Sequence, residues 1–131
     1  MSQPRTAAVL VTVLACGLGG EAGFAQAQVK PQEIEIVASD YTYTPLPPAI
    51  AAGPTIFSFV NRGKVQHELS IARLKQGVRV EDFVVTDTAV TRRRGMVERS
   101  VGILIAGPGK SPDGHLLVDL KKGATYVVTA T

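Results

Sequence analysis

The chain has 131 residues, with 14 lysines and arginines against 11 acidic residues and a net charge of +3. Its length predicts a single domain. The positive excess is too small to indicate nucleic-acid binding, and the lack of tryptophan argues against a surface that stacks on single strands.

The first 27 residues have the pattern of a secretory signal peptide. Arg5 is the only charged residue before Glu21, residues 6–18 form an almost unbroken apolar run, and a small-x-small cleavage pattern ends at Ala27. The run is shorter than the roughly 20 apolar residues of a membrane span. We therefore expect residues 1–27 to be removed on export, and residues 28–131 to form one periplasmic or secreted domain without a transmembrane span.

The only cysteine, Cys16, lies inside this leader. The exported domain would then contain neither a disulfide nor a thiolate ligand. A second interpretation is a lipoprotein processing site at residues 13–16, which would leave Cys16 lipidated at a new N-terminus. Leu14 fits the small position of that signal poorly, so the lipid anchor is the less favoured interpretation.

After the leader, the sequence mostly predicts short strands. Residues 33–38 alternate charged and apolar side chains, which is typical of a half-buried strand. Residues 41–50 contain three prolines within four positions, which indicates an edge strand or an irregular crossing. Residues 55–61 place Phe57 and Phe59 on one face. Asn61 and Gly63 have turn roles in the segment that follows, and residues 67–74 form the next strand.

The second half is less regular until its last strands. The sequence predicts a short helix near residues 81–88, or alternatively a loose connection. A short strand and turn follow at residues 101–110, and further strands are predicted at residues 115–120 and 125–131. Several short strands separated by glycine and proline turns predict an all-β Greek-key sandwich.

Three segments in this order resemble the cupredoxins, the blue-copper family. They are "DYTYTP", the stretch "AAGPTIFSFVNRGKVQHELSI" and the late "VDLKKGATYVV". The resemblance covers roughly residues 33–74 and 107–128, and it is nearest to small periplasmic cupredoxin-like proteins of bacteria. It implies a Greek-key sandwich that binds copper through two imidazoles, a thiolate and a weak thioether, and that transfers electrons. The first imidazole of the family corresponds to His67.

The sequence departs from the family at the other three ligands. The family's cysteine falls about four residues after the tyrosine of the late segment, at the position of Ala130, and the sequence given ends at Thr131. Two explanations stay open, which are truncation relative to the family and divergence with loss of the metal loop. Either one predicts a sandwich that lacks its last strand, with copper bound only through an incomplete site. Residues 125–131 would then have an unpaired side that favours an edge-strand dimer.

Three other residues are candidate metal ligands beside His67. Glu68 is expected on the opposite face of its strand. His115 precedes a strand and is expected to be an exposed loop residue, unless its turn folds toward His67. Met96 could supply a thioether, but nothing in the sequence fixes its position.

The remaining motifs indicate binding partners rather than catalysis. Arg92–Arg94 form a positive patch that is either a solvated loop or a docking surface for an acidic partner or an anionic membrane. "GPGKS" at residues 107–111 lacks the spacing and the following helix of a phosphate loop. No catalytic constellation can be built from two histidines and scattered acids, so we do not expect an enzyme. The resemblance implies a redox or other periplasmic protein partner.

Overall fold

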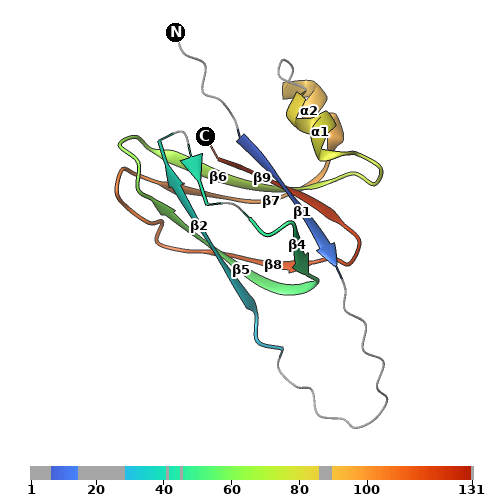
Figure 1. The fold of residues 1–131 in the computed structure, drawn as a ribbon, viewed down its shortest axis with the longest axis horizontal. Helices are drawn as coiled ribbons and strands as arrows, with labels where there is room; N and C mark the ends of the chain where they lie inside the picture. The colour runs from blue at the N-terminus through green and yellow to red at the C-terminus, as the bar shows by residue number, and fades with distance from the viewer. Residues whose placement is uncertain (1–6, 15–28, 41, 45, 86–89, 131) are drawn as a thin grey trace.

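Strands from two sheets make up most of the protein (Figure 1). The computed structural model describes residues 7–14, 29–40, 42–44, 46–85 and 90–130. The sheets pack face to face as two layers, with the two helices beside one end of the larger sheet. The predicted all-β sandwich is therefore confirmed as an architecture of two packed sheets.

The smaller sheet has four strands in the order β3-β2-β5-β8. Its strands are β2 (Gln32–Ser39), β3 (Thr42–Tyr43), β5 (Gly53–Asn61) and β8 (Leu116–Leu120). β2 runs parallel to β5, whereas β3 and β8 run antiparallel to their neighbours.

The larger sheet has five strands in the order β4-β1-β9-β6-β7. Its strands are β1 (Ala7–Leu14), β4 (Ala49–Ala51), β6 (His67–Leu74), β7 (Val97–Ala106) and β9 (Thr125–Ala130). β1 runs parallel to β4, and the other neighbours are antiparallel. The proline-rich segment supplies β3 and β4, which are edge strands of their sheets as its composition predicts.

Alternating side chains decide which face of each strand is buried. Along β5, Phe57 and Phe59 are buried, while Ile56, Ser58 and Val60, which alternate with them, are only partly buried. Along β6, Leu69 and Ile71 are fully buried on the same face as His67. Both predicted faces are therefore confirmed, and each buried phenylalanine contributes about 1.5–3 kcal/mol to folding.

The main core lies between the two sheets. It combines Ile36, Phe57 and Phe59 of the smaller sheet with Leu69 and Ile71 of the larger one. Because both sheets direct their apolar faces into this layer, the polar turns are left at its two ends, where a site can form.

Two helices cover a second, smaller cluster on the other face of the larger sheet. The helices are α1 (Val80–Val85) and α2 (Val90–Met96). Phe83 packs in this cluster with Leu74 and Val127. α1 confirms the helix predicted near residues 81–88 as far as Val85, and residues 86–88 lie outside the described residues. The sequence did not predict α2, and it placed the start of β7 at residue 101 instead of Val97.

Part of the predicted leader is a strand in this structure. β1 lies between β9 and β4, with Ala7 opposite Ala130 and Thr12 opposite Ala49. In the full chain β9 is therefore paired on both sides, and the open side predicted for residues 125–131 is not found along Thr125–Ala130, the part that the structure describes. The cleavage pattern that ends at Ala27 and Cys16 lie outside the described residues. No helix in the described part of the chain is both long and apolar enough to span a membrane.

Candidate functional site

A buried asparagine organises the turn that leads to His67. Asn61, at the end of β5, is completely buried, and its Nδ2 donates to the carbonyl oxygens of Val65 at 2.7 Å and Ala106 at 2.9 Å. Nδ2 also lies 3.1 Å from the carbonyl oxygen of Gly107, and Oδ1 accepts the N–H of Gly63 at 2.7 Å. An amide can donate and accept at once, so one side chain holds the β5–β6 turn against the end of β7.

Asp40, in the turn that follows β2, is hydrogen-bonded to the β5–β6 turn. Its two carboxylate oxygens accept the backbone N–H of Lys64 at 2.8 and 3.0 Å. Its Oδ1 also lies 3.3 Å from Nε2 of His67. The hydrogen bond from Lys64 is the main cause that holds the pKa of Asp40 below its ordinary value, and His67 adds to it while burial opposes it. Asp40 is therefore a carboxylate that is held in place beside the imidazole.

His67 is the first residue of β6 and keeps only 9% of its surface exposed. Gly63 packs directly against it, since a Cβ at that position would lie 2.7 Å from Nε2 of His67 and would collide with Asp40. The glycine is thus required by close approach, and not by a left-handed backbone. Asp40, Asn61 and Gly63 together fix the imidazole at one end of the sandwich, in what we call the His67 corner.

A carboxylate beside an imidazole is the usual setting of a metal-binding histidine. The carboxylate fixes the orientation of the ring and raises the basicity of the ligand. The remaining donors of a type 1 copper site do not fit, because the described residues contain no group of three or more His, Cys, Asp or Glu side chains that could hold a metal. The His67 corner thus offers one imidazole and one carboxylate, and the blue-copper donor set is not assembled there.

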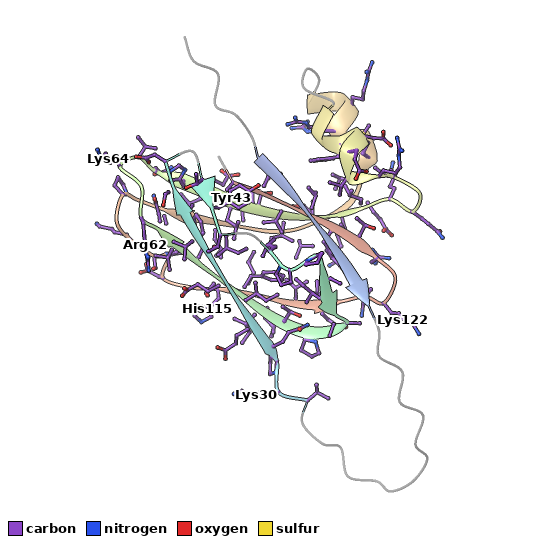
Figure 2. The ribbon with its side chains drawn as sticks, viewed as in Figure 1. Lys30, Tyr43, Arg62, Lys64, His115 and Lys122 are labelled. Atoms are coloured by element: carbon purple, nitrogen blue, oxygen red, sulfur yellow. The ribbon has the colours of Figure 1, made fainter. Side chains whose placement is uncertain are left out.

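The other candidate ligands lie elsewhere. His115 is exposed in the loop before β8, and Figure 2 shows it apart from Lys64, whose N–H binds Asp40. Met96 packs in the second cluster at the opposite end of β6 from His67. Glu68 is only partly buried, in contrast to His67 and Leu69 on either side, as expected for the opposite face of the strand. None of the three shares the His67 corner.

The arginine patch is helical instead of a loop. Arg92 to Arg94 lie on α2, with Arg92 and Arg94 exposed. The guanidinium of Arg93 lies over the ring of Phe83, 5.6 Å from its centroid. This cation–π contact ties the patch to the second cluster, so at least one of the three arginines has a structural role.

Sequence reasoning missed Asp40 and the full role of Asn61. Asn61 was expected only as a turn residue, whereas its amide bridges to a strand end 45 residues away. Asp40 directly follows the alternating strand β2, and nothing local indicates that it meets a turn 24 residues later. The Asn61 contact depends on how the two sheets pack against each other, whereas the Asp40 contact depends on the parallel pairing of β2 with β5, which brings the ends of both strands together.

Comparison with known proteins yields no match, either among protein-family models or among curated proteins. The likeness to cupredoxins therefore rests on the quoted residues, and the chemistry of the site has to be argued from the His67 corner itself.

Proposed function

We propose that this chain is an exported, cupredoxin-like protein that binds copper through His67, with Asp40 orienting the imidazole. The contact of 3.3 Å between Nε2 of His67 and Oδ1 of Asp40 carries the proposal, because ligating histidines are commonly oriented by a carboxylate. The position of His67 directly after the β5–β6 turn gives further support, since the resemblance assigns the first copper imidazole to that residue.

The proposal includes a Greek-key connection of the strands. The chain passes from the smaller sheet to the larger one between β5 and β6, returns between β7 and β8, and crosses again between β8 and β9. Such repeated crossing between two layers is the feature that cupredoxins share with other Greek-key sandwiches.

The expected copper chemistry is binding, without electron transfer. A bound copper ion would supply a redox-active centre, but the described residues of the His67 corner include one imidazole, where the family uses two imidazoles and a thiolate. One imidazole with one neighbouring carboxylate gives weak affinity and no thiolate-to-copper absorption. The protein is accordingly proposed as a binding protein and not as an enzyme.

Titration with Cu(II) tests this assignment. All samples carry Cys16→Ser, so that the thiol of the leader does not compete, and binding is followed by calorimetry and electron paramagnetic resonance. We expect weak one-site binding that His67→Ala abolishes and that His115→Ala, the matched histidine control, leaves unchanged. Equal binding by the wild type and the His67→Ala variant would refute the assignment.

A second candidate function is a copper-free binding module, and the position of β1 favours it. β1 fills the place between β4 and β9, and it belongs to the predicted leader. If export removes residues 1–27, the backbone groups of β9 on that side become available to another strand. We then expect residues 28–131 to dimerise or to lose stability relative to the full chain. Light scattering that shows a stable, two-state monomer of residues 28–131 would contradict this candidate.

A further inference from the structure

Two arginines lie side by side on the inner face of the larger sheet, far from the His67 corner. Arg99 of β7 is directly opposite Arg73 of β6, and Arg73 is opposite Tyr126 of β9. Like charges directly opposite one another in a sheet are destabilising. Arg73 lies six positions along β6 from His67, or roughly 20 Å of strand, so the row formed by Arg99, Arg73 and Tyr126 is independent of the proposed copper site.

Neighbouring acidic side chains neutralise only part of the positive charge around Arg73 and Arg99. Nε of Arg73 lies 3.0 Å from Oε2 of Glu98, and Nζ of Lys121 pairs with Asp119. Arg99 makes no ion pair with any residue that the structure describes. Two of the three cations are thus compensated, and the Arg99 guanidinium keeps its donors for another group.

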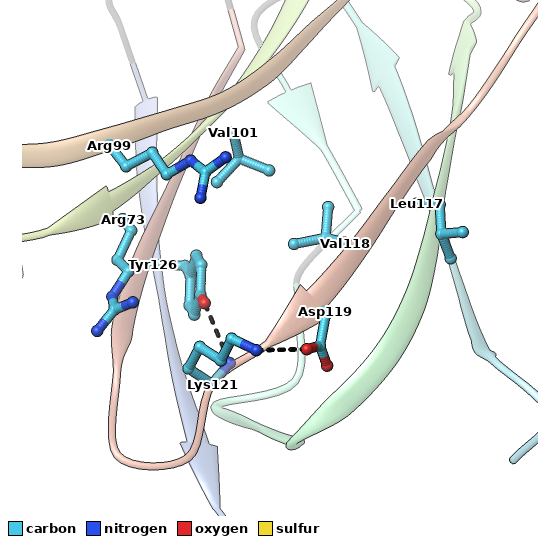
Figure 3. A pocket seen from close by; sticks show the side chains of 8 residues that line it. All are labelled: Arg73, Arg99, Val101, Leu117, Val118, Asp119, Lys121 and Tyr126. Carbon is cyan, nitrogen blue, oxygen red and sulfur yellow. Dashed lines mark hydrogen bonds and ion pairs between the residues drawn. The ribbon is translucent and has the colours of Figure 1, made fainter.

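A hollow of about 330 Å³ between the sheets, shown in Figure 3, is lined by Arg73, Arg99, Asp119 and Lys121. It opens at the side where β7 and β8, the edge strands of their sheets, face each other. Val118 of the main core and Val101, which packs against that core, form its apolar wall. The volume is at the lower end of the range for small-molecule sites, which are typically apolar with a few placed polar groups.

The tyrosine adds a hydroxyl to the same hollow. The hydroxyl oxygen of Tyr126 accepts the backbone N–H of Lys121 at 3.1 Å, as the dashed line in Figure 3 marks. Because that contact uses a lone pair, the phenolic proton can still be donated to a ligand. The hollow therefore combines guanidinium and hydroxyl donors on one side with branched apolar side chains on the other.

We propose that this hollow binds a small organic carboxylate with an apolar body. The guanidinium of Arg99 matches a carboxylate with two parallel hydrogen bonds, and Arg73 adds positive charge beside it. The apolar body packs against Val101 and Val118. Among the described residues only Arg99 of the three cations lacks an acidic partner, which favours a monoanion over a doubly charged phosphate ester. A bound anion also neutralises the opposed arginines.

The opposition of Arg73 and Arg99 has a second explanation, and the experiment must distinguish it from ligand binding. Charged residues that point inward from an edge strand protect a sheet against pairing with other chains, and β7 is an edge strand. Under that explanation a change at Arg99 alters the oligomeric state and has no effect on ligand affinity.

Calorimetric titration of the full chain with 3-phenylpropionate tests the proposal. We expect saturable binding that weakens at high salt. The neutral 3-phenylpropanol and inorganic phosphate should each bind at least tenfold more weakly, because each lacks one half of the recognised chemistry. Equal binding of the alcohol or of phosphate would overturn the proposal, as would no binding of the carboxylate.

Variants then locate the site. Arg99→Gln should weaken 3-phenylpropionate binding at least tenfold, and Arg99→Lys, which keeps the charge and loses the planar fork, should weaken it less. Arg62→Gln, an exposed arginine on the β5–β6 turn, is the matched control and should bind like the wild type. If Arg99→Gln changes only the oligomeric state, with affinity unaltered, the edge-protection explanation holds and the proposal fails. Arg99→Lys keeps the test decisive if Arg99→Gln does not fold.

Discussion

Replacing Asn61 by aspartate is predicted to be among the most damaging single changes to this fold. The two side chains have almost the same shape, so the substitution leaves packing intact and exchanges the Nδ2 donor for an acceptor. Nδ2 donates to the carbonyl oxygens of Val65 and Ala106 and lies within reach of Gly107. In Asn61→Asp these carbonyl oxygens face a carboxylate oxygen in a fully buried place.

The expected loss is large relative to the stability of a domain of this size. Two donated hydrogen bonds at about 1 kcal/mol each are lost, and buried carbonyls left without a donor cost about 1–3 kcal/mol more. The free energy of unfolding should therefore fall by about 3–5 kcal/mol, against a total of about 5–15 kcal/mol for a typical domain.

Urea unfolding at neutral pH, followed by far-ultraviolet circular dichroism, measures this difference. Gln66→Glu is the matched control, because it makes the same amide-to-carboxylate change at an exposed position of the same turn. The control should lie within about 0.5 kcal/mol of the wild type. If Asn61→Asp also lies within that margin, Asn61 does not hold the turn in the way described.

Two further predictions concern the His67 corner. The pKa of Asp40 is lowered in the folded state, mainly by the Lys64 N–H, so its stabilisation is present at neutral pH and is lost as the pH falls. The stability advantage of the wild type over Asp40→Asn should therefore shrink below about pH 4, as measured by urea midpoints, and a constant difference would contradict it. Gly63→Ala should lower the free energy of unfolding by about 1–3 kcal/mol, because the added Cβ meets Asp40 and His67. The open Gly95→Ala in α2 should instead raise it by up to about 1 kcal/mol, and equal thermal melting of the two variants would refute the close approach at Gly63.

The strands were predictable because their faces are encoded locally. In β5 the alternation around Phe57 and Phe59 fixes the buried face, and in β6 Leu69 and Ile71 place His67 on the inner side. The turn between these strands also follows from its asparagine and glycine. Period-two patterns of this kind require no knowledge of the partner strands.

The features that sequence reasoning missed depend on contacts between distant segments. α2 contains three consecutive arginines and a glycine, so its local pattern is poor, and Arg93 is held there by the ring of Phe83. Asp40 reaches His67 only because β2 and the β5–β6 turn end at the same corner. The opposition of Arg73 and Arg99 depends on a register that contains a bulge. Neither strand predicts that register by itself.

The position of the apolar leader is the clearest case of two competing interpretations of one segment. Its apolar run predicts a signal peptide, and the same run supplies β1 to the larger sheet. Both are compatible with an apolar sequence, because a strand buried in a sandwich and the core of a leader have similar composition.

Paramagnetic NMR tests residue by residue whether His67 is the copper ligand. Substoichiometric Cu(II) is added to the isotope-labelled Cys16→Ser chain, and the broadening of backbone amide signals is mapped. If His67 holds the copper, the signals of the His67 corner broaden first, which are those of Asp40, Gly63, Lys64 and His67. Broadening centred on His115, or spread evenly over the surface, would contradict it.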